Sequence, residues 1–204
     1  MADLNIDSIF SWALLHKAEI AGTFFGLVYI WFSIRQSLHT WTAGIVTSLL
    51  YCWVFFDAKI YAGMGLQIYY VGISIYGWLS WHKMGDQSSG ENQLKVTVTE
   101  WTLWLKLITA ITLVSFFMYF ILDRYTDSPV PLWDSLTTSL SVFATWMLAR
   151  KKIEHWLIWI FVDLVSVVMY LHRGLNSTVI LFFVYALMAA IGYYEWRKDL
   201  KKLI

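Results

Sequence analysis

The stretch WLIWIFVDLVSVVMYL, residues 156–171, decides the fold of this chain. All of its side chains are apolar or aromatic except those of Asp163 and Ser166, and with its flanks it is long enough to cross a bilayer as a helix. A charge at the bilayer centre costs on the order of 3 kcal/mol, so the Asp163 carboxylate is expected to face other helices or a wet cavity rather than lipid. The stretch therefore predicts a membrane helix whose carboxylate points into a bundle.

The composition indicates a membrane protein. Of the 204 residues, 59% are hydrophobic and 14% are charged, whereas soluble domains carry about 25% charged residues. The net charge of +1 argues against nucleic acid as a partner. The chain has one cysteine, Cys52, so no disulfide can form within it.

Seven apolar runs have the length of membrane spans. They are about 18–34, 41–56, 60–81, 103–122, 132–149, 155–172 and 177–196. The predicted fold class is therefore an all-α membrane protein with seven transmembrane helices. We also expect a short interfacial segment at 1–15 and a polar, flexible loop at 82–100.

Lysine and arginine counts in the loops predict the orientation. Four of these residues, including Lys17 and Arg124, lie on one side of the predicted bundle, and ten, including Lys151 and Lys202, lie on the other. Cytoplasmic loops are enriched in lysine and arginine. The N-terminus is therefore expected in the periplasm and the C-terminus in the cytoplasm, in a multi-pass protein of the bacterial inner membrane.

The chain matches itself at an offset of 115 positions, without a gap over about 68 residues. The matches include Trp31 with Trp146, Arg35 with Arg150, Trp41 with Trp156, Tyr70 with Tyr185, Gly77 with Gly192 and Trp81 with Trp196. Each copy holds three spans and the fourth span returns the chain, so two parallel repeats are expected, with a site between them. The predicted domains are a first three-helix bundle at 16–81, a linker loop and linker helix at 82–131, a second bundle at 132–198 and a cytoplasmic tail at 199–204.

Several recurrent residues have structural interpretations. Tryptophans near span ends are typical of the membrane interface, and five are interpreted in this way. They are Trp31, Trp41, Trp81, Trp146 and Trp196. The pair Gly22 and Gly26 has the spacing of close helix packing.

Trp156, Trp159 and Asp163 are spaced i, i+3 and i+7, which places them on one face of the sixth span. Three interpretations of Asp163 are open. It can lock helices together, either protonated or hydrogen-bonded to Ser166 or Thr138, or it can couple the protein to ions or protons. We favour recognition of a cationic or hydrogen-bond-donating substrate, because aromatic rings beside a carboxylate suit a flat cationic heterocycle.

The first repeat offers a different polar face. Gln67, Tyr70 and Ser74 are spaced i, i+3 and i+7 on the third span, and Ser48 is the repeat partner of Asp163. Gln67 can both donate and accept hydrogen bonds, although it can also serve as a contact between helices. The predicted substrate-binding residues are Ser48, Trp53, Gln67, Tyr70, Ser74, Trp156, Trp159, Asp163 and Tyr185. Their asymmetry between the repeats suits an asymmetric ligand.

Other classes of seven-helix protein fit the sequence less well. The run 177–196 has no lysine for a retinal Schiff base, and the five histidines lie at span ends or in loops without metal-ligand spacing. No enzyme activity, cofactor or metal is predicted. The alternatives from other classes are a seven-helix receptor and, because no P-loop is present, the substrate-binding subunit of an ATP-driven complex.

Two stretches resemble the Pnu family of bacterial vitamin transporters. They are DAKIYAGMGLQIYYVGISIYGWLSWHK, residues 57–83, and HWLIWIFVDLVSVVMYLHRGL with IGYYEWRK, within residues 155–198. The resemblance extends over residues 18–198. It implies a fold similar to that of the SWEET sugar transporters, facilitated diffusion of a water-soluble vitamin, trapping by intracellular phosphorylation, and a homotrimer.

The resemblance also bears on the substrate. In the nicotinamide riboside branch, the sixth-span motif has two tryptophans followed by asparagine, which match Trp156, Trp159 and position 163, and a glutamine matches Gln67. Asp163 departs from this motif. Thiamine, whose thiazolium cation and aminopyrimidine donor both suit a carboxylate, is therefore the expected substrate. Nicotinamide riboside, also a cation, is the first alternative, and neutral riboflavin is the next.

Overall fold

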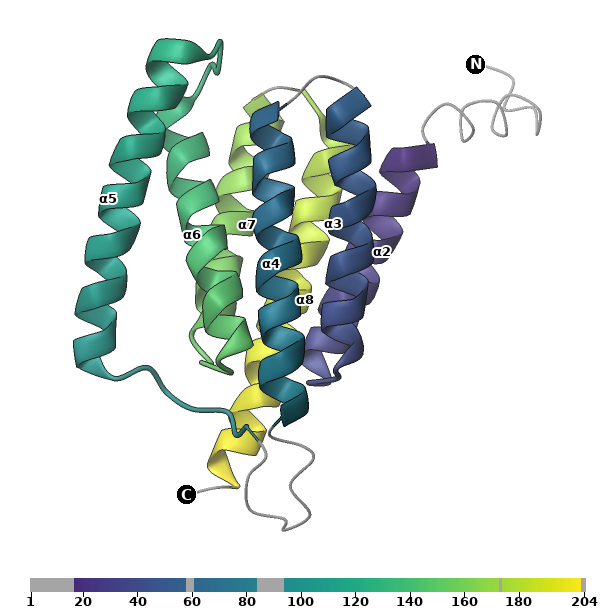
Figure 1. The fold of residues 1–204 in the computed structure, drawn as a ribbon, viewed down its shortest axis with the longest axis vertical. Helices are drawn as coiled ribbons and strands as arrows, with labels where there is room; N and C mark the ends of the chain where they lie inside the picture. Colours follow the sequence, from purple (N-terminus) through teal and green to yellow (C-terminus); the bar gives the residue numbers. More distant parts are fainter. Residues whose placement is uncertain (1–16, 58–60, 84–93, 173, 203–204) are drawn as a thin grey trace.

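The computed structural model describes residues 17–57, 61–83, 94–172 and 174–202, and seven long helices lie within these ranges (Figure 1). They are α2 (Lys17–Ile34), α3 (His39–Asp57), α4 (Tyr61–Lys83), α5 (Trp101–Tyr125), α6 (Pro131–Ala149), α7 (His155–His172) and α8 (Asn176–Lys201). Each helix overlaps one predicted span, so the prediction of an all-helical, seven-helix protein is confirmed. The predicted interfacial segment at 1–15 lies outside the described residues.

Length and composition alone allow three of the described helices, α5, α7 and α8, to cross a membrane. Within α2, the stretch Ala21–Ile34 is a shorter apolar segment. Helices are the expected form for such sequence, because each backbone hydrogen bond is then satisfied inside the segment. The last helix continues to Lys201, so the predicted tail at 199–204 is helical over its first half.

Six of the helices form a closed ring. We call α2, α3 and α4 the first set, and α6, α7 and α8 the second set. In the first set α3 contacts both α2 and α4, and in the second set α7 contacts both α6 and α8. The sets meet where α2 contacts α8 and where α4 contacts α6. The corresponding helices of the two sets run in the same direction, and α5 lies at the edge of the bundle against α6 (Figure 1). A ring of this kind leaves its interior free for a site.

Matched contacts recur in the two sets at the offset of 115. The Trp41 ring lies so close to Gly77 that a Cβ atom there would overlap it, and a Cβ atom at Gly192 would lie 2.6 Å from the Trp156 ring. The indoles of Trp41 and Trp81 meet edge-on, with ring centres 5.2 Å apart, and Trp156 and Trp196 meet in the same way at 5.7 Å. These paired contacts support the internal repeat, which is an inference from the sequence.

Two indole groups join the sets reciprocally. The Trp81 Nε1–H donates to the carbonyl oxygen of Ala149 over 3.1 Å, and the Trp196 Nε1–H donates to those of Ser33 and Ile34 over 3.1 and 3.2 Å. These carbonyls lie in the last turns of α6 and α2, where no further helical N–H is available to them. An indole N–H of each set therefore caps the C-terminal end of a helix in the other set.

The interpretation of five tryptophans as interfacial residues is wrong for three of them. Trp41 and Trp196 are fully buried, and Trp81 is 6% exposed. They form one apolar core at the end of the ring where α8 ends. Trp31, which is 51% exposed, keeps the environment expected at an interface, with the Arg35 guanidinium 4.4 Å from its ring centre.

Residues 94–100 of the predicted flexible loop are ordered. The Thr97 N–H donates to the Lys151 carbonyl oxygen, and the Ile153 N–H donates back to the Thr97 carbonyl oxygen, both over 3.0 Å. The Glu154 carboxylate accepts hydrogen bonds from the backbone N–H and the hydroxyl of Thr99, over 2.8 and 2.7 Å. Val96 is buried in the same core as the tryptophans. We call residues 94–100 the strap, because they bind the turn between α6 and α7.

The Trp–Gly contacts can be tested by substitution. Gly77→Ala should lower the unfolding temperature in detergent, because overpacking of this kind costs about 1–3 kcal/mol. Gly72→Ala on the same helix is the matched control, because a Cβ atom at Gly72 meets no atom within 4 Å. Equal unfolding temperatures for the two variants would contradict the close approach of Trp41 to Gly77.

Candidate functional site

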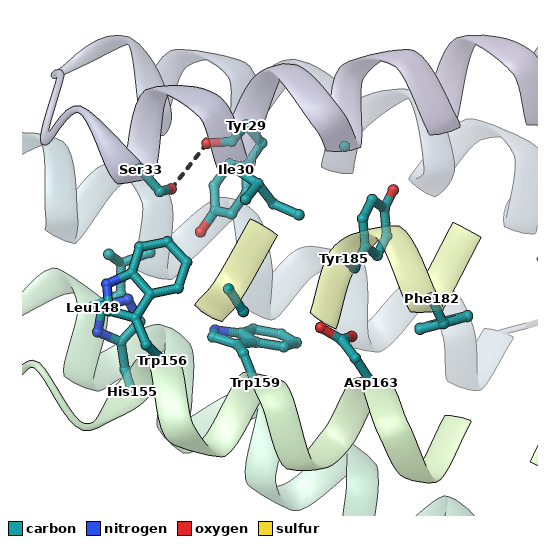
Figure 2. A pocket seen from close by; sticks show the side chains of 12 residues that line it. Tyr29, Ile30, Ser33, Leu148, His155, Trp156, Trp159, Asp163, Phe182 and Tyr185 are labelled. Atoms are coloured by element: carbon teal, nitrogen blue, oxygen red, sulfur yellow. Dashed lines mark hydrogen bonds between the residues drawn. The ribbon is translucent and has the colours of Figure 1, made fainter. Parts of the chain in front are cut away.

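Two adjoining cavities lie inside the ring of helices. The first has a volume of about 190 Å³ and is shown in Figure 2. It is lined by Gly26, Tyr29, Ile30, Ser33, Leu148, His155, Trp156, Trp159, Asp163, Phe182, Tyr185 and Ala189. Most of these residues come from α2, α7 and α8, so this cavity belongs mainly to the second set of helices and to α2.

The second cavity has a volume of about 240 Å³. It is lined by Gly26, Tyr29, Gly44, Thr47, Ser48, Tyr51, Gln67, Tyr70, Ser74, Thr145 and Trp159. Most of these residues come from α2, α3 and α4. Gly26, Tyr29 and Trp159 line both cavities, so a single ligand can contact the two halves.

Asp163 is the acidic residue of the first cavity. Its side chain is 4% exposed and points into the space that Trp159 and Tyr185 border (Figure 2). Within the described part of the chain, no hydrogen bond or ion pair reaches its carboxylate. The Ser166 hydroxyl donates to the Val162 carbonyl oxygen of its own helix instead. The structure therefore shows no hydrogen bond between Asp163 and Ser166 that could lock helices together.

Aromatic rings surround this carboxylate. Trp159 lies one turn before Asp163 on α7, and α8 contributes Phe182 and Tyr185, whose ring centres are 5.9 Å apart with an angle of 77° between the rings (Figure 2). Ring faces attract cations, and the attraction is stronger where water is excluded. A carboxylate among such rings can hold a flat cation by charge and by stacking.

The second cavity has a neutral, hydrogen-bonding wall. Gln67 offers both a donor and an acceptor, and Ser48 and Ser74 offer hydroxyl groups. Close by, the Tyr69 hydroxyl donates to the Val142 carbonyl oxygen over 2.8 Å, which ties α4 to α6. This wall can bind uncharged polar groups of a ligand.

The two cavities correspond through the offset of 115, but their chemistry differs. The corresponding lining residues are Ser48 and Asp163, Gly44 and Trp159, Gln67 and Phe182, Tyr70 and Tyr185, and Ser74 and Ala189. Three polar residues of the first set, Ser48, Gln67 and Ser74, correspond to an acid, an aromatic ring and a methyl group in the second set. A ligand therefore meets an acidic aromatic half and a neutral polar half.

Eight of the nine predicted substrate-binding residues line at least one of the two cavities, and Trp159 lines both. The first cavity contains Trp156, Trp159, Asp163 and Tyr185, and the second contains Ser48, Gln67, Tyr70 and Ser74. Trp53 lines neither cavity, and its side chain is 72% exposed. Trp53 is therefore the one predicted binding residue that lies outside the described linings of both cavities.

Sequence reasoning missed Tyr29, which lines both cavities. The available signal was its position three and seven residues after Gly26 and Gly22, on the same face of α2. Those glycines do serve close packing: a Cβ atom at Gly22 would overlap the Tyr51 hydroxyl, and one at Gly26 would overlap the Tyr185 hydroxyl. Small residues on this face leave room for tyrosines of both sets.

Among the described residues, no group of three or more His, Cys, Asp or Glu side chains could hold a metal ion. His155 lines the first cavity, but its Nδ1–H donates to the Lys152 carbonyl oxygen over 2.7 Å. The described linings of the two cavities consist of aromatic, aliphatic, hydroxyl, amide and carboxylate groups.

Comparison with known proteins identifies the family. The family model described as nicotinamide mononucleotide transporter matches residues 16–198. Nicotinamide riboside transporter PnuC of Escherichia coli (strain K12) is 23% identical over 200 residues, which cover 87% of this chain and 84% of that protein. Riboflavin/roseoflavin transporter RibM of Streptomyces davaonensis is 22% identical over 180 residues, with coverages of 88% and 84%.

A solved structure has the same fold. The crystal structure of the vitamin B3 transporter PnuC aligns with a TM-score of 0.72 at 19% identity, covering 96% of this chain and 87% of that one. Because the family model spans almost the whole sequence, this chain belongs to the nicotinamide mononucleotide transporter family and is a multi-pass inner-membrane transporter of the PnuC type, not an enzyme.

Proposed function

We propose that this transporter carries a cationic, water-soluble vitamin into the bacterial cytoplasm by facilitated diffusion, with thiamine as the first candidate. The observation that carries the proposal is the Asp163 carboxylate, which is buried in an aromatic cavity and accepts no hydrogen bond from any described residue. A buried carboxylate without a partner is costly. A bound cation would offset that cost, whereas a neutral ligand would not.

The two cavities suit the two rings of thiamine. The thiazolium cation would lie against Trp159 and Tyr185, beside Asp163. The aminopyrimidine would lie in the second cavity, where the Gln67 amide can accept from its amino group and donate to a ring nitrogen.

Nicotinamide riboside is the second candidate. The relatives from Escherichia coli and Neisseria mucosa are named nicotinamide riboside transporters, and the pyridinium ring of that compound is also a cation. Its ribose hydroxyls would suit Ser48 and Ser74. Riboflavin ranks third, despite its presence in the name of RibM, because a neutral ring gains nothing from the charge of Asp163.

The arrangement of the helices in two sets of three supports a transport mechanism. If the sets rock about the cavities, the site opens to one side at a time. No second described carboxylate lines the cavities, so the proposal includes no ion coupling, and phosphorylation inside the cell would trap the vitamin. The proposal retains the N-terminus in the periplasm, the C-terminus in the cytoplasm, and a homotrimer.

The role of Asp163 can be tested by binding calorimetry with thiamine, nicotinamide riboside and riboflavin. Asp163→Asn should weaken thiamine binding by about tenfold or more, because a hydrogen bond to a charged group contributes about 1.5–3 kcal/mol. Riboflavin binding should not fall in parallel. Trp53→Phe is the control, since Trp53 is exposed and lies outside both linings.

Two results would change the proposal. Equal affinity of the parent and the Asp163→Asn variant for both cations would contradict charge recognition. Tighter binding of nicotinamide riboside than of thiamine by the parent would replace the first candidate with the second.

The passive mechanism predicts how uptake ends. Thiamine uptake into proteoliposomes should stop when the inner and outer concentrations are equal, and an imposed sodium or proton gradient should not change that end point. Liposomes without protein are the control for leakage. Accumulation of unmodified vitamin above the outside concentration would rule out facilitated diffusion.

A further inference from the structure

At the end of the ring where α8 ends, a hydrogen-bonded chain links the two sets of helices. The Lys151 Nζ donates to the Gln36 Oε1 over 3.0 Å, and the Gln36 Nε2 donates to the Asp199 Oδ2 over 2.8 Å. Gln36 lies in the turn between α2 and α3, Lys151 in the turn between α6 and α7, and Asp199 on α8. We call these three residues the latch.

The latch lies where the two repeats meet. Gln36 and Lys151 are 115 positions apart, so each is the repeat partner of the other. Both have left-handed backbone conformations, with φ of 53° and 50°, which non-glycine residues adopt in few places. Their hydrogen bond therefore joins equivalent turns of the two sets across the boundary between them.

Between the latch and the first cavity, aromatic and aliphatic side chains of both sets pack together. The Lys151 ammonium lies 4.7 Å from the centre of the Trp81 ring, and Trp81 and Trp196 make the reciprocal bonds to the opposite set. Ser33 and Leu148 lie at the floor of the first cavity, and they are 2% and 1% exposed. A solute in the cavity cannot pass this end while these contacts hold.

We infer that the latch and the two tryptophans beneath it, Trp81 and Trp196, form the gate on the lysine-rich side of the transporter, and that the gate is closed in this structure. Its contacts are hydrogen bonds and ring contacts between the two sets, so it can open without disrupting the packing inside either set. The inference rests on the proposed transport function for its purpose, although the gate itself can be tested without any substrate.

The strap should move with one side of the gate. Thr97 pairs with the backbone of Lys151 and Ile153, and Thr99 bonds to Glu154, so residues 94–100 are attached to the second set. On the side of the first set, the latch is held by the Gln36 hydrogen bonds and by the Trp81 ring beneath the Lys151 ammonium. Gln36 is consequently the residue whose loss should release the gate.

The test measures access to Ser33 from the cytoplasmic side. A single cysteine is introduced as Ser33→Cys in a Cys52→Ser background, and its reaction with a membrane-impermeant maleimide is followed in inside-out vesicles without substrate. The added change Gln36→Asn keeps an amide and tolerates the left-handed turn, but its shorter side chain cannot reach both partners. Labelling should become about tenfold faster, since hydrogen bonds to charged groups are lost.

Lys198→Met is the matched control. It breaks the exposed 2.7 Å ion pair with Glu195 at the same end of the protein and leaves the latch intact, so labelling should stay slow. Asp199→Asn, which weakens the latch from α8, is the second variant if Gln36→Asn unfolds. Rapid labelling of the parent, or equal rates in the parent and a folded latch variant, would overturn the gate. Failure to bind thiamine would leave the labelling result unaffected.

The closed latch also predicts a pH dependence of stability. Burial lowers the pKa of the Lys151 ammonium to about 8, and the Asp199 carboxylate partly offsets this effect. Asp199 on α8 is itself paired with Lys202, which directly follows that helix, whereas Gln36 and Trp81 present neutral groups to the Lys151 ammonium. In the unfolded chain the pKa is about 10.4.

The folded protein therefore binds fewer protons at Lys151 than the unfolded chain between these two pKa values, so this residue adds stability as the pH rises from 8 to 10. The unfolding temperature of the parent, minus that of Lys151→Met, should increase over this range and level off below pH 8. A difference that does not change with pH would mean that Lys151 is hydrated and the latch is open in the resting protein.

Discussion

A carboxylate within a membrane helix cannot face lipid at tolerable cost, and the rest of the structure accommodates this constraint. Asp163 is placed inside a ring of six helices, in a cavity between α2, α7 and α8. The ring is possible because α2 and α4, and likewise α6 and α8, are held apart by the helix between them. The hollow that houses the acid is thus also the space in which a solute can bind.

The helices could be predicted from the sequence because their signal is local. Apolar runs long enough to span a bilayer have few alternatives to helical structure. The face that carries Trp156, Trp159 and Asp163 follows from helical periodicity alone. The offset of 115 further indicated which residues in the two halves should occupy equivalent positions, although no single helix shows it.

The features that could not be predicted from the sequence depend on tertiary contacts. An indole has an apolar body and one polar N–H, so it suits both the membrane interface and a core in which a helix end offers a free carbonyl group. Trp81 and Trp196 occupy such cores, and only the partner carbonyls distinguish them from Trp31. The sequence alone predicts a flexible loop for the strap, because the order of the strap depends on pairing with a turn more than 50 residues away. Trp53 shows the reverse case, in which an aromatic residue in a span lies on the outer surface.

The two halves agree in the contacts that hold them together and differ in the residues that line the cavities. The Trp–Gly contacts and the reciprocal indole bonds are the same in both sets, so each set is stiffened in the same way. Between these matched ends, Ser48 corresponds to Asp163 and Gln67 corresponds to Phe182 at the offset of 115. Such an arrangement separates two demands. The matched contacts stabilise each set in the same way, while the lining of the cavities differs between the sets.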